Sequence, residues 1–293
     1  MNHLVCLGMG FSATALAELV AREGWKITGS SRTPEGAAEI RARGWHGFAF
    51  DALQDESVLR NELAGWLSDA THLVISIPPG DQGDLIARDY ADDIARLPKL
   101  EWVGYLSTIG VYGDQQGEWV DETTPPVPLS KRSKLRLEAE NAWQSLAKGA
   151  RWRLQIFRLA GIYGPGRSAI DQILAGKARR IIKKDQVFNR IHVADIATIL
   201  RAGMAGAGQH TIYNVADDEP GPPQDVVAFA ARLLGVEPPP EVAFEDADLS
   251  LMGRSFYNER KRVRNDRVKA DLGIRLNYPN YREGLAAIMA AKT

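Results

Sequence analysis

Three small residues with the spacing of a phosphate-binding loop stand near the start of the chain. Gly8, Gly10 and Ala13 lie in the stretch G-M-G-F-S-A, which follows the apolar run L-V-C-L and opens a segment with helical periodicity. Glycines at the first two positions allow a tight turn and the approach of a pyrophosphate, and a small third residue lets the helix pack close to the strand. A helix N-terminus also favours anions. The pattern therefore predicts a dinucleotide loop, with Phe11 and Ser12 as neighbouring contacts.

The end of the second expected strand indicates which dinucleotide is favoured. An NAD site usually has an acidic residue there, which binds the ribose 2′-hydroxyl, whereas this chain has G-S-S-R-T at 29–33. Ser30 and Ser31 can donate hydrogen bonds to a 2′-phosphate, and Arg32 can bind it with two parallel bonds. NADP is therefore the preferred cofactor, with NAD as the alternative. Asp51 follows the third expected strand and is a candidate partner of the adenine amino group, although a capping aspartate has the same position.

The elements that must position these residues are alternating strands and helices. Short runs rich in β-forming residues alternate with helical patterns, as in the βαβ units of a parallel sheet. The clearest helical stripe spans 12–23. Ile77 and Pro78, at the end of the fourth strand, are further candidate cofactor contacts. The predicted fold is α/β, a Rossmann-type doubly wound parallel sheet with strands at 4–7, 26–30, 47–50, 72–77, 102–107 and 154–159.

The second half of the chain has a looser rhythm and more frequent Pro and Gly clusters, which mark loops. We expect a dinucleotide-binding domain over 1–160, to which 187–215 contributes. A smaller C-terminal substrate domain is expected from 161–186 and 216–293.

Bulk composition excludes several other classes of protein. The chain has 293 residues with 36 basic and 37 acidic side chains, a balance that gives no reason to expect a nucleic-acid or membrane partner. Cys6 is the only cysteine and the five histidines lack metal-ligand spacing, so neither a disulfide nor a metal site is expected. The start of the chain has no signal-peptide pattern, and no apolar run reaches about 18 residues. A cytoplasmic location follows as the expectation.

Several longer blocks resemble one family when they are taken in order. They are S-T-I-G-V-Y-G (107–113), D-E-T (121–123), R-L-A-G-I-Y-G-P-G (158–166), I-H-V-A-D-I-A (191–197), Y-N-V (213–215) and R-N-D (264–266). With the glycine loop, they resemble the extended short-chain dehydrogenase/reductase superfamily, also called the NAD-dependent epimerase/dehydratase family. The resemblance covers nearly the whole chain. Because its glycine spacing is unusual for the superfamily, the chain is similar to an atypical branch of that superfamily.

The resemblance implies a catalytic machinery with one substitution. Family members have a Tyr-x-x-x-Lys pair, in which the tyrosine is the acid/base and the lysine binds the nicotinamide ribose and lowers the pKa of the tyrosine. The lysine aligns with Lys134 and the tyrosine with Ser130. A serine hydroxyl is far less acidic than a phenol, whose pKa is about 10. The family residue that binds the substrate oxygen aligns with Thr108, so the candidate catalytic residues are Thr108, Ser130 and Lys134.

The same stretch also fits a solvated helix face. Lys131 and Arg136 are basic, and Glu138 and Glu140 have the helical spacing to pair with them. Such charge runs usually face solvent. The resemblance reassigns only Lys134 to a ribose site, and we expect Lys131 and Arg136 to remain at the surface.

Two functions remain open for this sequence. The first is an NAD(P)-dependent, epimerase/dehydratase-like oxidoreductase that acts on a carbonyl or carbinol of a small polar substrate, such as a sugar nucleotide or phosphorylated compound. Tyr112, Tyr163, Lys131 or a water molecule would then replace the missing acid, although ring packing is the simpler role for both tyrosines. The second is a non-catalytic NADP(H)-binding sensor or regulatory protein. A structural relative with no ligand leaves the glycine loop unexplained.

Candidate substrate contacts are Tyr112, Arg190 and His192. Arg190 precedes the I-H-V block and can bind an anionic group, with a surface salt bridge as the alternative. His192 also fits a packed or capping histidine. The basic stretch 254–264 contains two aromatic residues and is either a substrate-domain loop or a solvated one. The expected partners are the dinucleotide and a small-molecule substrate, with a homodimer as the candidate assembly.

Overall fold

The computed structural model describes residues 1–51, 63 and 65–292. The chain forms two compact units, which are described separately. Unit 1 comprises Met1–Thr108, Lys131–Arg158 and Ala197–Tyr213, and unit 2 comprises Ile109–Ser130, Leu159–Ile196 and Asn214–Thr293.

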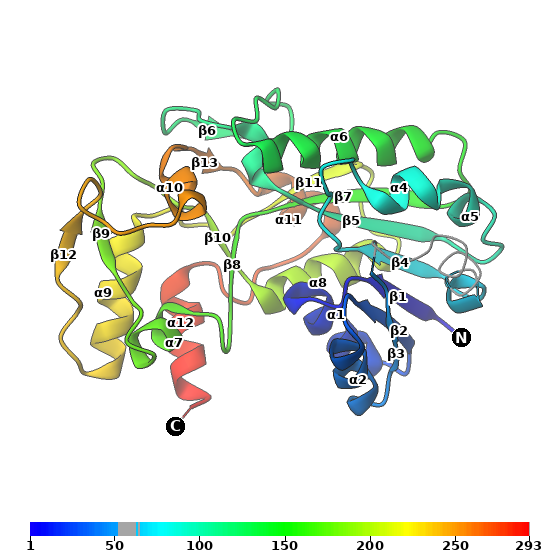
Figure 1. Ribbon diagram of the computed structural model, residues 1–293, viewed down its shortest axis with the longest axis horizontal. Helices are drawn as coiled ribbons and strands as arrows, with labels where there is room; N and C mark the ends of the chain where they lie inside the picture. Colours follow the sequence, from blue (N-terminus) through cyan, green and yellow to red (C-terminus); the bar gives the residue numbers. More distant parts are fainter. Residues whose placement is uncertain (52–62, 64, 293) are drawn as a thin grey trace. The chain divides into compact units, whose positions relative to one another are not determined.

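Unit 1 is built on a seven-stranded sheet with the order β11-β7-β5-β4-β1-β2-β3 (Figure 1). Registered neighbours on both sides of β1 run parallel, and the strand order reverses there, as in dinucleotide-binding folds. The predicted fold class and all six predicted strands are therefore confirmed. The strands are β1 (His3–Leu7), β2 (Lys26–Ser31), β3 (His46–Ala49), β4 (His72–Ile75), β5 (Trp102–Thr108), β7 (Arg153–Leu159) and β11 (Ile212–Val215).

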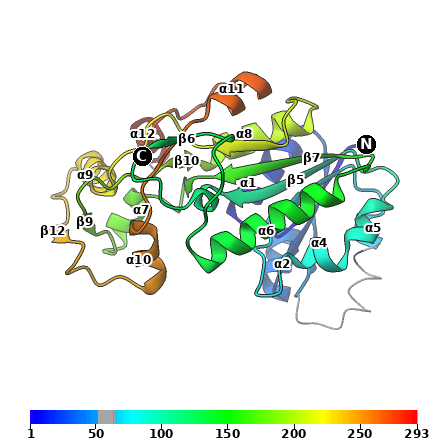
Figure 2. The same cartoon turned by 90° about the horizontal axis from the view of Figure 1, so that it is seen from above.

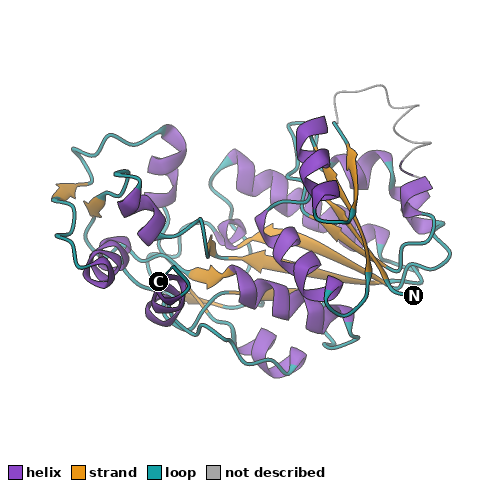
Figure 3. Cartoon of the chain, turned by 90° about the horizontal axis from the view of Figure 1, so that it is seen from below, coloured by secondary structure: helices purple, strands orange, loops and turns teal. Residues whose placement is uncertain are grey.

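Helices cover both faces of this sheet, which explains its almost continuous apolar strands. Figure 1 shows α4, α5 and α6 on one face and α1, α2 and α8 on the other, and Figure 3 shows the strands side by side in one twisted sheet. On the α6 face, Tyr105 and Trp143 are among the largest fully buried side chains. The helices are α1 (Phe11–Ala21), α2 (Pro34–Ala42), α4 (Leu85–Asp89), α5 (Ala91–Ala95), α6 (Lys131–Leu146) and α8 (Val193–Met204).

A buried ion pair fixes α6 to the sheet. Glu140 is 0% exposed and Arg158, on β7, is 3% exposed, and their Oε2 and Nη2 atoms are 2.7 Å apart. Ser107 on β5 donates from Oγ to Glu140 Oε1 at 2.5 Å. The prediction that Glu140 pairs on a solvated face is wrong, because the buried stripe of α6 includes position 140 together with Ser133 and Trp143.

Arg136 provides a second link between α6 and β5, and Figure 2 shows the two elements running alongside each other. The Arg136 guanidinium donates to the carbonyl of Leu106 at 2.7 Å and to the hydroxyl of Tyr105 at 3.2 Å. The prediction that Arg136 faces solvent is therefore wrong. Both links hold α6 against the carboxyl end of β5.

Unit 2 contains three pairs of parallel strands, β10-β8, β12-β9 and β13-β6. A separate apolar core joins α7, α9 and α12. The segments 109–130 and 187–196, expected in the dinucleotide-binding domain, cluster here because their strands pair with β13 and β8. The elements are η1 (Ile109–Tyr112), β6 (Trp119–Val120), β8 (Gly161–Tyr163), α7 (Ala169–Leu174), β9 (Arg180–Ile182), β10 (Arg190–His192), α9 (Pro223–Leu234), β12 (Glu241–Ala243), α10 (Leu251–Tyr257), β13 (Arg262–Val263), α11 (Asp266–Leu272) and α12 (Tyr281–Ala290).

Unit 2 also buries a carboxyl group. Asp217 is 2% exposed, and its Oδ1 accepts a hydrogen bond from the Glu219 amide at 3.2 Å. Burial raises its pKa to about 8, and the nearby charges of Asp218 and Glu219 act in the same direction, whereas Arg190 opposes the shift. The carboxyl group is therefore protonated between about pH 4 and pH 8, where an exposed aspartate is charged.

We expect loss of the ion pair to destabilise unit 1 strongly. Glu140→Ala leaves the Arg158 charge buried without its partner, which costs about 3–5 kcal/mol in unfolding free energy. Replacing both residues, as Glu140→Leu with Arg158→Met, should recover most of that loss, while the exposed control Glu138→Ala should stay within about 0.5 kcal/mol. Urea denaturation measures all three. A loss below about 1 kcal/mol for Glu140→Ala would contradict the assignment.

The stability of the protein should also depend on the protonation of Asp217. Its folded-state pKa of about 8 exceeds the ordinary value of 3.8, so the native state binds more protons and stability decreases as pH rises between these values. Asp217→Asn removes this dependence. The free energy of unfolding of the variant, relative to that of the wild type, should therefore rise as the pH increases across that window, by about 2 kcal/mol or more at pH 9. Denaturant titrations at pH 4 and pH 9 test this, and a pH-independent difference would refute it.

Candidate functional site

The glycine loop has the shape that its sequence predicts. Gly8 has a φ of +93°, and a Cβ atom there would lie 3.0 Å from the backbone nitrogen of Ile77, so only glycine fits without strain. A Cβ atom on Gly10 would meet nothing within 4 Å, so this position is open. Helix α1 begins directly afterwards at Phe11. The loop therefore presents backbone and a helix N-terminus at an open position, as a pyrophosphate site requires.

Ser30 holds this loop in place. It is buried, and its Oγ accepts a hydrogen bond from the amide of Gly8 at 2.8 Å. Its carbonyl accepts a second bond from the amide of Met9 at 2.7 Å. The structure thus gives the Ser30 oxygens a supporting role, and Ser31 and Arg32 are the more exposed side chains at this strand end.

The first turn of α2 lies against Ser31. Thr33 caps the helix, with its side chain accepting from the amide of Gly36 at 3.2 Å. A Cβ atom on Gly36 would overlap the hydroxyl of Ser31, so the helix approaches this strand end more closely than a larger residue would allow. Arg32 is exposed, and none of the described residues forms an ion pair or hydrogen bond with its guanidinium.

The remaining cofactor candidates gather at one edge of the sheet. Asp51 follows β3, Ile77 and Pro78 follow β4, and Thr108 ends β5. Parallel strands have their carboxyl ends at the same edge, and ligands of open α/β sheets bind there. Unit 1 thus brings these four residues to the edge that carries the glycine loop.

The start of α6 places the proposed Tyr-x-x-x-Lys positions. Ser130 directly precedes the helix, at the N-cap position, where serine is a preferred residue. Lys134 lies one turn later and is exposed, and its ammonium has no ion pair or hydrogen bond with the part of the chain that the structure describes. Lys131 is exposed, as expected, and its Nζ pairs with Asp81 at 2.8 Å.

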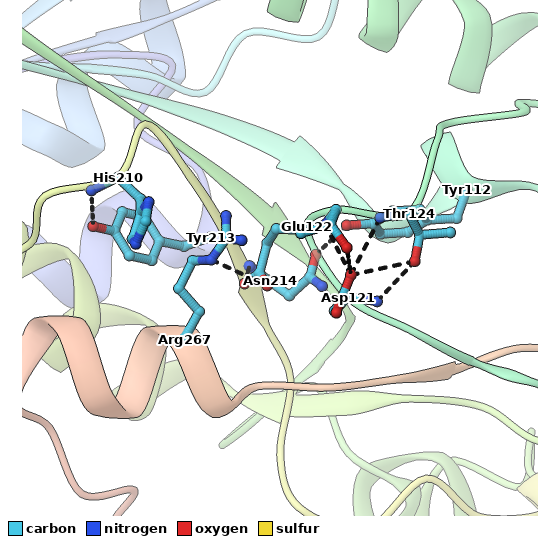
Figure 4. A network of polar contacts seen from close by, with 9 residues as sticks. Tyr112, Asp121, Glu122, Thr124, His210, Tyr213, Asn214 and Arg267 are labelled. Carbon is cyan, nitrogen blue, oxygen red and sulfur yellow. Dashed lines mark hydrogen bonds and ion pairs between the residues drawn. The ribbon is translucent and has the colours of Figure 1, made fainter.

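A polar network in unit 2 surrounds Tyr112, as Figure 4 shows. The Tyr112 hydroxyl donates to the side-chain Oδ1 of Asn214 at 2.8 Å. The backbone N–H of Asn214 donates to Glu122 Oε1 at 2.8 Å. Arg267 Nε lies 3.5 Å from Glu122 Oε2. Burial raises the pKa of Glu122. Glu122 lies in the D-E-T block and Asn214 in the Y-N-V block, but no pattern in the sequence connects either residue with Tyr112.

Arg190 and His192 are buried within the same unit. Arg190 donates to the carbonyl oxygens of Phe188 at 3.0 Å and Gly221 at 3.1 Å, so the alternative of a surface salt bridge is wrong. His192 accepts from the amide of Ala194 at 3.2 Å through Nδ1, and burial lowers its pKa to about 4. It is therefore neutral near pH 7. The substrate-binding roles of Tyr112, Arg190 and His192 stay predictions.

Two features are absent from the described residues. They contain no cluster of three or more His, Cys, Asp or Glu side chains that could hold a metal ion. No helix among them is both long and apolar enough to cross a membrane.

Comparisons with known proteins identify relatives that cover nearly the whole chain. No protein-family model matches the chain. Protein YeeZ of Escherichia coli K12 is 31% identical over 288 residues, which cover 96% of this chain and 97% of YeeZ. A conserved protein of Silicibacter pomeroyi has a solved structure that is 47% identical, with a TM-score of 0.88 and coverage of 100% of this chain and 99% of its own.

A second solved structure relates the chain to a described enzyme class. A provisional NAD-dependent epimerase/dehydratase from Methylobacillus flagellatus is 26% identical, with a TM-score of 0.74 and coverage of 99% of this chain and 98% of its own. Together with the end-to-end relative and the strand order around the glycine loop, this shows that the chain belongs to the NAD-dependent epimerase/dehydratase family of the extended short-chain dehydrogenases/reductases.

Proposed function

We propose that this protein is an NADP-preferring oxidoreductase of the epimerase/dehydratase type. It acts on a carbonyl or carbinol of a small polar substrate, with sugar nucleotides and phosphorylated compounds as the candidate classes. The observation that carries the proposal is the glycine loop. Its backbone packs against Ile77 at Gly8, has free space beside Gly10, and is held by the hydrogen bond from the Gly8 amide to Ser30. A cytoplasmic location and a homodimer are part of the same proposal.

The residues present fit a dinucleotide. Its pyrophosphate would lie against Gly10 and the first turn of α1, formed by Phe11, Ser12 and Ala13, where helix amides lack intrahelical partners. Asp51 would accept from the adenine amino group. Ile77 and Pro78 would line the same edge of the sheet.

The end of β2 supports the preference for NADP. Ser31 and Arg32 replace the carboxylate of a typical NAD site, and Arg32 has no described partner that competes with a phosphate. The close approach of α2 at Gly36 adds a helix N-terminus to this position. Ser31, Arg32 and the N-terminus of α2 each favour a dianionic 2′-phosphate at this position.

Thr108 and Lys134 have the remaining roles. Thr108, at the end of β5, would hydrogen-bond the substrate oxygen, and the ammonium of Lys134 would bind the nicotinamide ribose. When bound, the cofactor supplies or accepts the hydride. Ser133, which is buried, and Arg136, which is half-buried and bonded to the carbonyl of Leu106, would keep this helix and Lys134 in position.

A second candidate function is a cofactor-responsive sensor. Ser130 favours it, because serine at the tyrosine position caps a helix but cannot carry a proton as a phenol does. The sensor would retain the whole adenosine half of the proposed site and would lack hydride transfer.

The cofactor preference predicts a selective effect at Arg32. NADPH should bind more tightly than NADH, and Arg32→Ala should weaken NADPH by about 10–100-fold, the worth of a charge-assisted hydrogen bond, while leaving NADH unchanged. Cofactor fluorescence titrations measure both constants. Arg43→Ala, on the same helix-strand unit but paired with Glu18, is the matched control. An equal loss for both cofactors would remove the 2′-phosphate assignment.

A label-transfer experiment distinguishes the proposed enzyme from the sensor. The wild type should transfer tritium from [4-3H]NADPH to an acceptor in a pool of carbonyl metabolites. Ser130→Tyr and Ser130→Phe differ only in the phenolic hydroxyl, and both lose a cap worth about 1 kcal/mol. Transfer by Ser130→Tyr alone, with none by the wild type or Ser130→Phe, would instead establish a sensor that has lost its catalytic acid.

A further inference from the structure

Carbonyl reduction at this site needs a proton as well as a hydride. The carbonyl carbon gains the hydride, the π pair becomes a lone pair on oxygen, and that oxygen must be protonated. Ser130 occupies the position of the family acid, and its alkyl hydroxyl is much less acidic than a phenol. The following inference rests on the oxidoreductase function proposed above.

The tyrosines of the chain are occupied in packing. All eight lie in the described part, and Tyr278, the one that is partly exposed, packs its ring 4.0 Å from that of His192. Tyr163 donates to the carbonyl of Asn280 at 3.3 Å, and burial raises its pKa. The buried members are Tyr90, Tyr105, Tyr112, Tyr163, Tyr213, Tyr257 and Tyr281.

The histidines of unit 1 and the cysteine do not lie at this edge of the sheet. His3, His46 and His72 are at the amino ends of β1, β3 and β4, and the carboxyl ends that carry the candidate site lie at the opposite edge of the sheet. His210 precedes β11 and is also at an amino end. Cys6 is buried, and burial raises the pKa of its thiol to about 12.

The basic residues of the first turns of α6 are not equivalent. Lys131 is paired with Asp81, and Arg136 is bonded to the carbonyl of Leu106. Lys134 is exposed and without a described partner. An alkylammonium group has an ordinary pKa of about 10.4 and a phenol of about 10, so the two are acids of similar strength.

Lys134 lies close to the position of the missing acid along the chain. Ser130 directly precedes α6, and Lys134 follows four residues later in the first turns of the helix. The bonds of Arg136 to Leu106 and of Glu140 to Ser107 hold that helix beside the end of β5, where Thr108 follows. The part of α6 that carries Lys134 is thus held beside the end of this strand.

We propose that Lys134 is the proton donor of the reaction, in place of the tyrosine that Ser130 replaces. In reduction, the Nζ–H bond breaks and its proton passes to the substrate oxygen, leaving a neutral amine that water reprotonates. In oxidation, the neutral amine takes the proton of the carbinol. Thr108 orients the oxygen, and Lys134 both binds the ribose and carries the proton.

Chemical protection tests the location of Lys134 without turnover. Acetylation of lysines, followed by peptide mass spectrometry, should slow at least about tenfold at Lys134 when NADP is bound, because the ammonium is then enclosed by ribose and nicotinamide. Adenosine 2′,5′-bisphosphate, which lacks both the nicotinamide ribose and the nicotinamide base, should not protect it. Lys131 is the internal control in each sample. Equal reactivity of Lys134 with and without NADP would overturn the proposal.

A substitution series tests the proton itself, with NADPH and a panel of dicarbonyls that includes 9,10-phenanthrenequinone. Lys134→Arg keeps the charge and hydrogen-bond donors, but a guanidinium does not release its proton, so kcat should fall about 100-fold or more while NADPH affinity stays within about threefold. Lys134→Cys treated with 2-bromoethylamine restores an amine that is more acidic than lysine. It should recover activity with a pH optimum shifted downward, and the buried Cys6 should remain unlabelled.

The outcomes separate the inference from the proposed function. Lys148→Arg, at an exposed position in the turn after α6, should keep the wild-type kcat within about twofold. Full activity and an unchanged pH profile in Lys134→Arg would overturn the proton-donor role while leaving the oxidoreductase intact. Failure of the wild type to oxidise NADPH with any acceptor of the panel, despite tight NADPH binding, would overturn both.

Discussion

The buried contact between Glu140 and Arg158 is the constraint on which the candidate site depends. An ion pair that is removed from water is stable only when each charge keeps good partners, and here Ser107 completes the set. These three residues come from α6, β7 and β5, so the pair fixes one helix across two strands. The exposed flank of α6 that carries Lys134 is a consequence, because a helix with position 140 inside must turn positions 134 and 138 outward.

A second constraint acts at the other end of the site, where backbone rather than charge determines the geometry. Gly8 lies against the segment after β4, and Ser30 ties the loop to β2. Since β2, β1 and β4 are neighbours in a parallel sheet, one short loop contacts both adjoining strand ends. The open position at Gly10 and the exposed Arg32 follow from that packing. The residues proposed for the adenosine half of the site therefore all lie within unit 1.

The parts that sequence could predict are those set by local pattern. Apolar runs located six strands, and the spacing of Gly8, Gly10 and Ala13 located the loop. Sequence failed where distant residues decide: helical spacing pairs Glu140 with Arg136 as readily as it buries the side chain against Arg158. The bond from the Gly8 amide to Ser30 is likewise not visible in the sequence, and the cofactor contact of Ser30 stays a prediction. The strand β11 and the network around Tyr112 escaped prediction because each joins segments separated by dozens of residues.

The serine at position 130 connects stability with chemistry. At the start of a helix, serine is among the best N-cap residues and tyrosine is not, so the serine that aligns with the family acid is a residue type that suits the position before α6. Sites that perform chemistry commonly sacrifice stability. A cofactor-responsive sensor would keep the glycine loop as well, so the loop does not separate the two candidate functions. The feature that the proposed proton donor needs in addition is Lys134, exposed and without a described partner, on a helix that is held to the sheet.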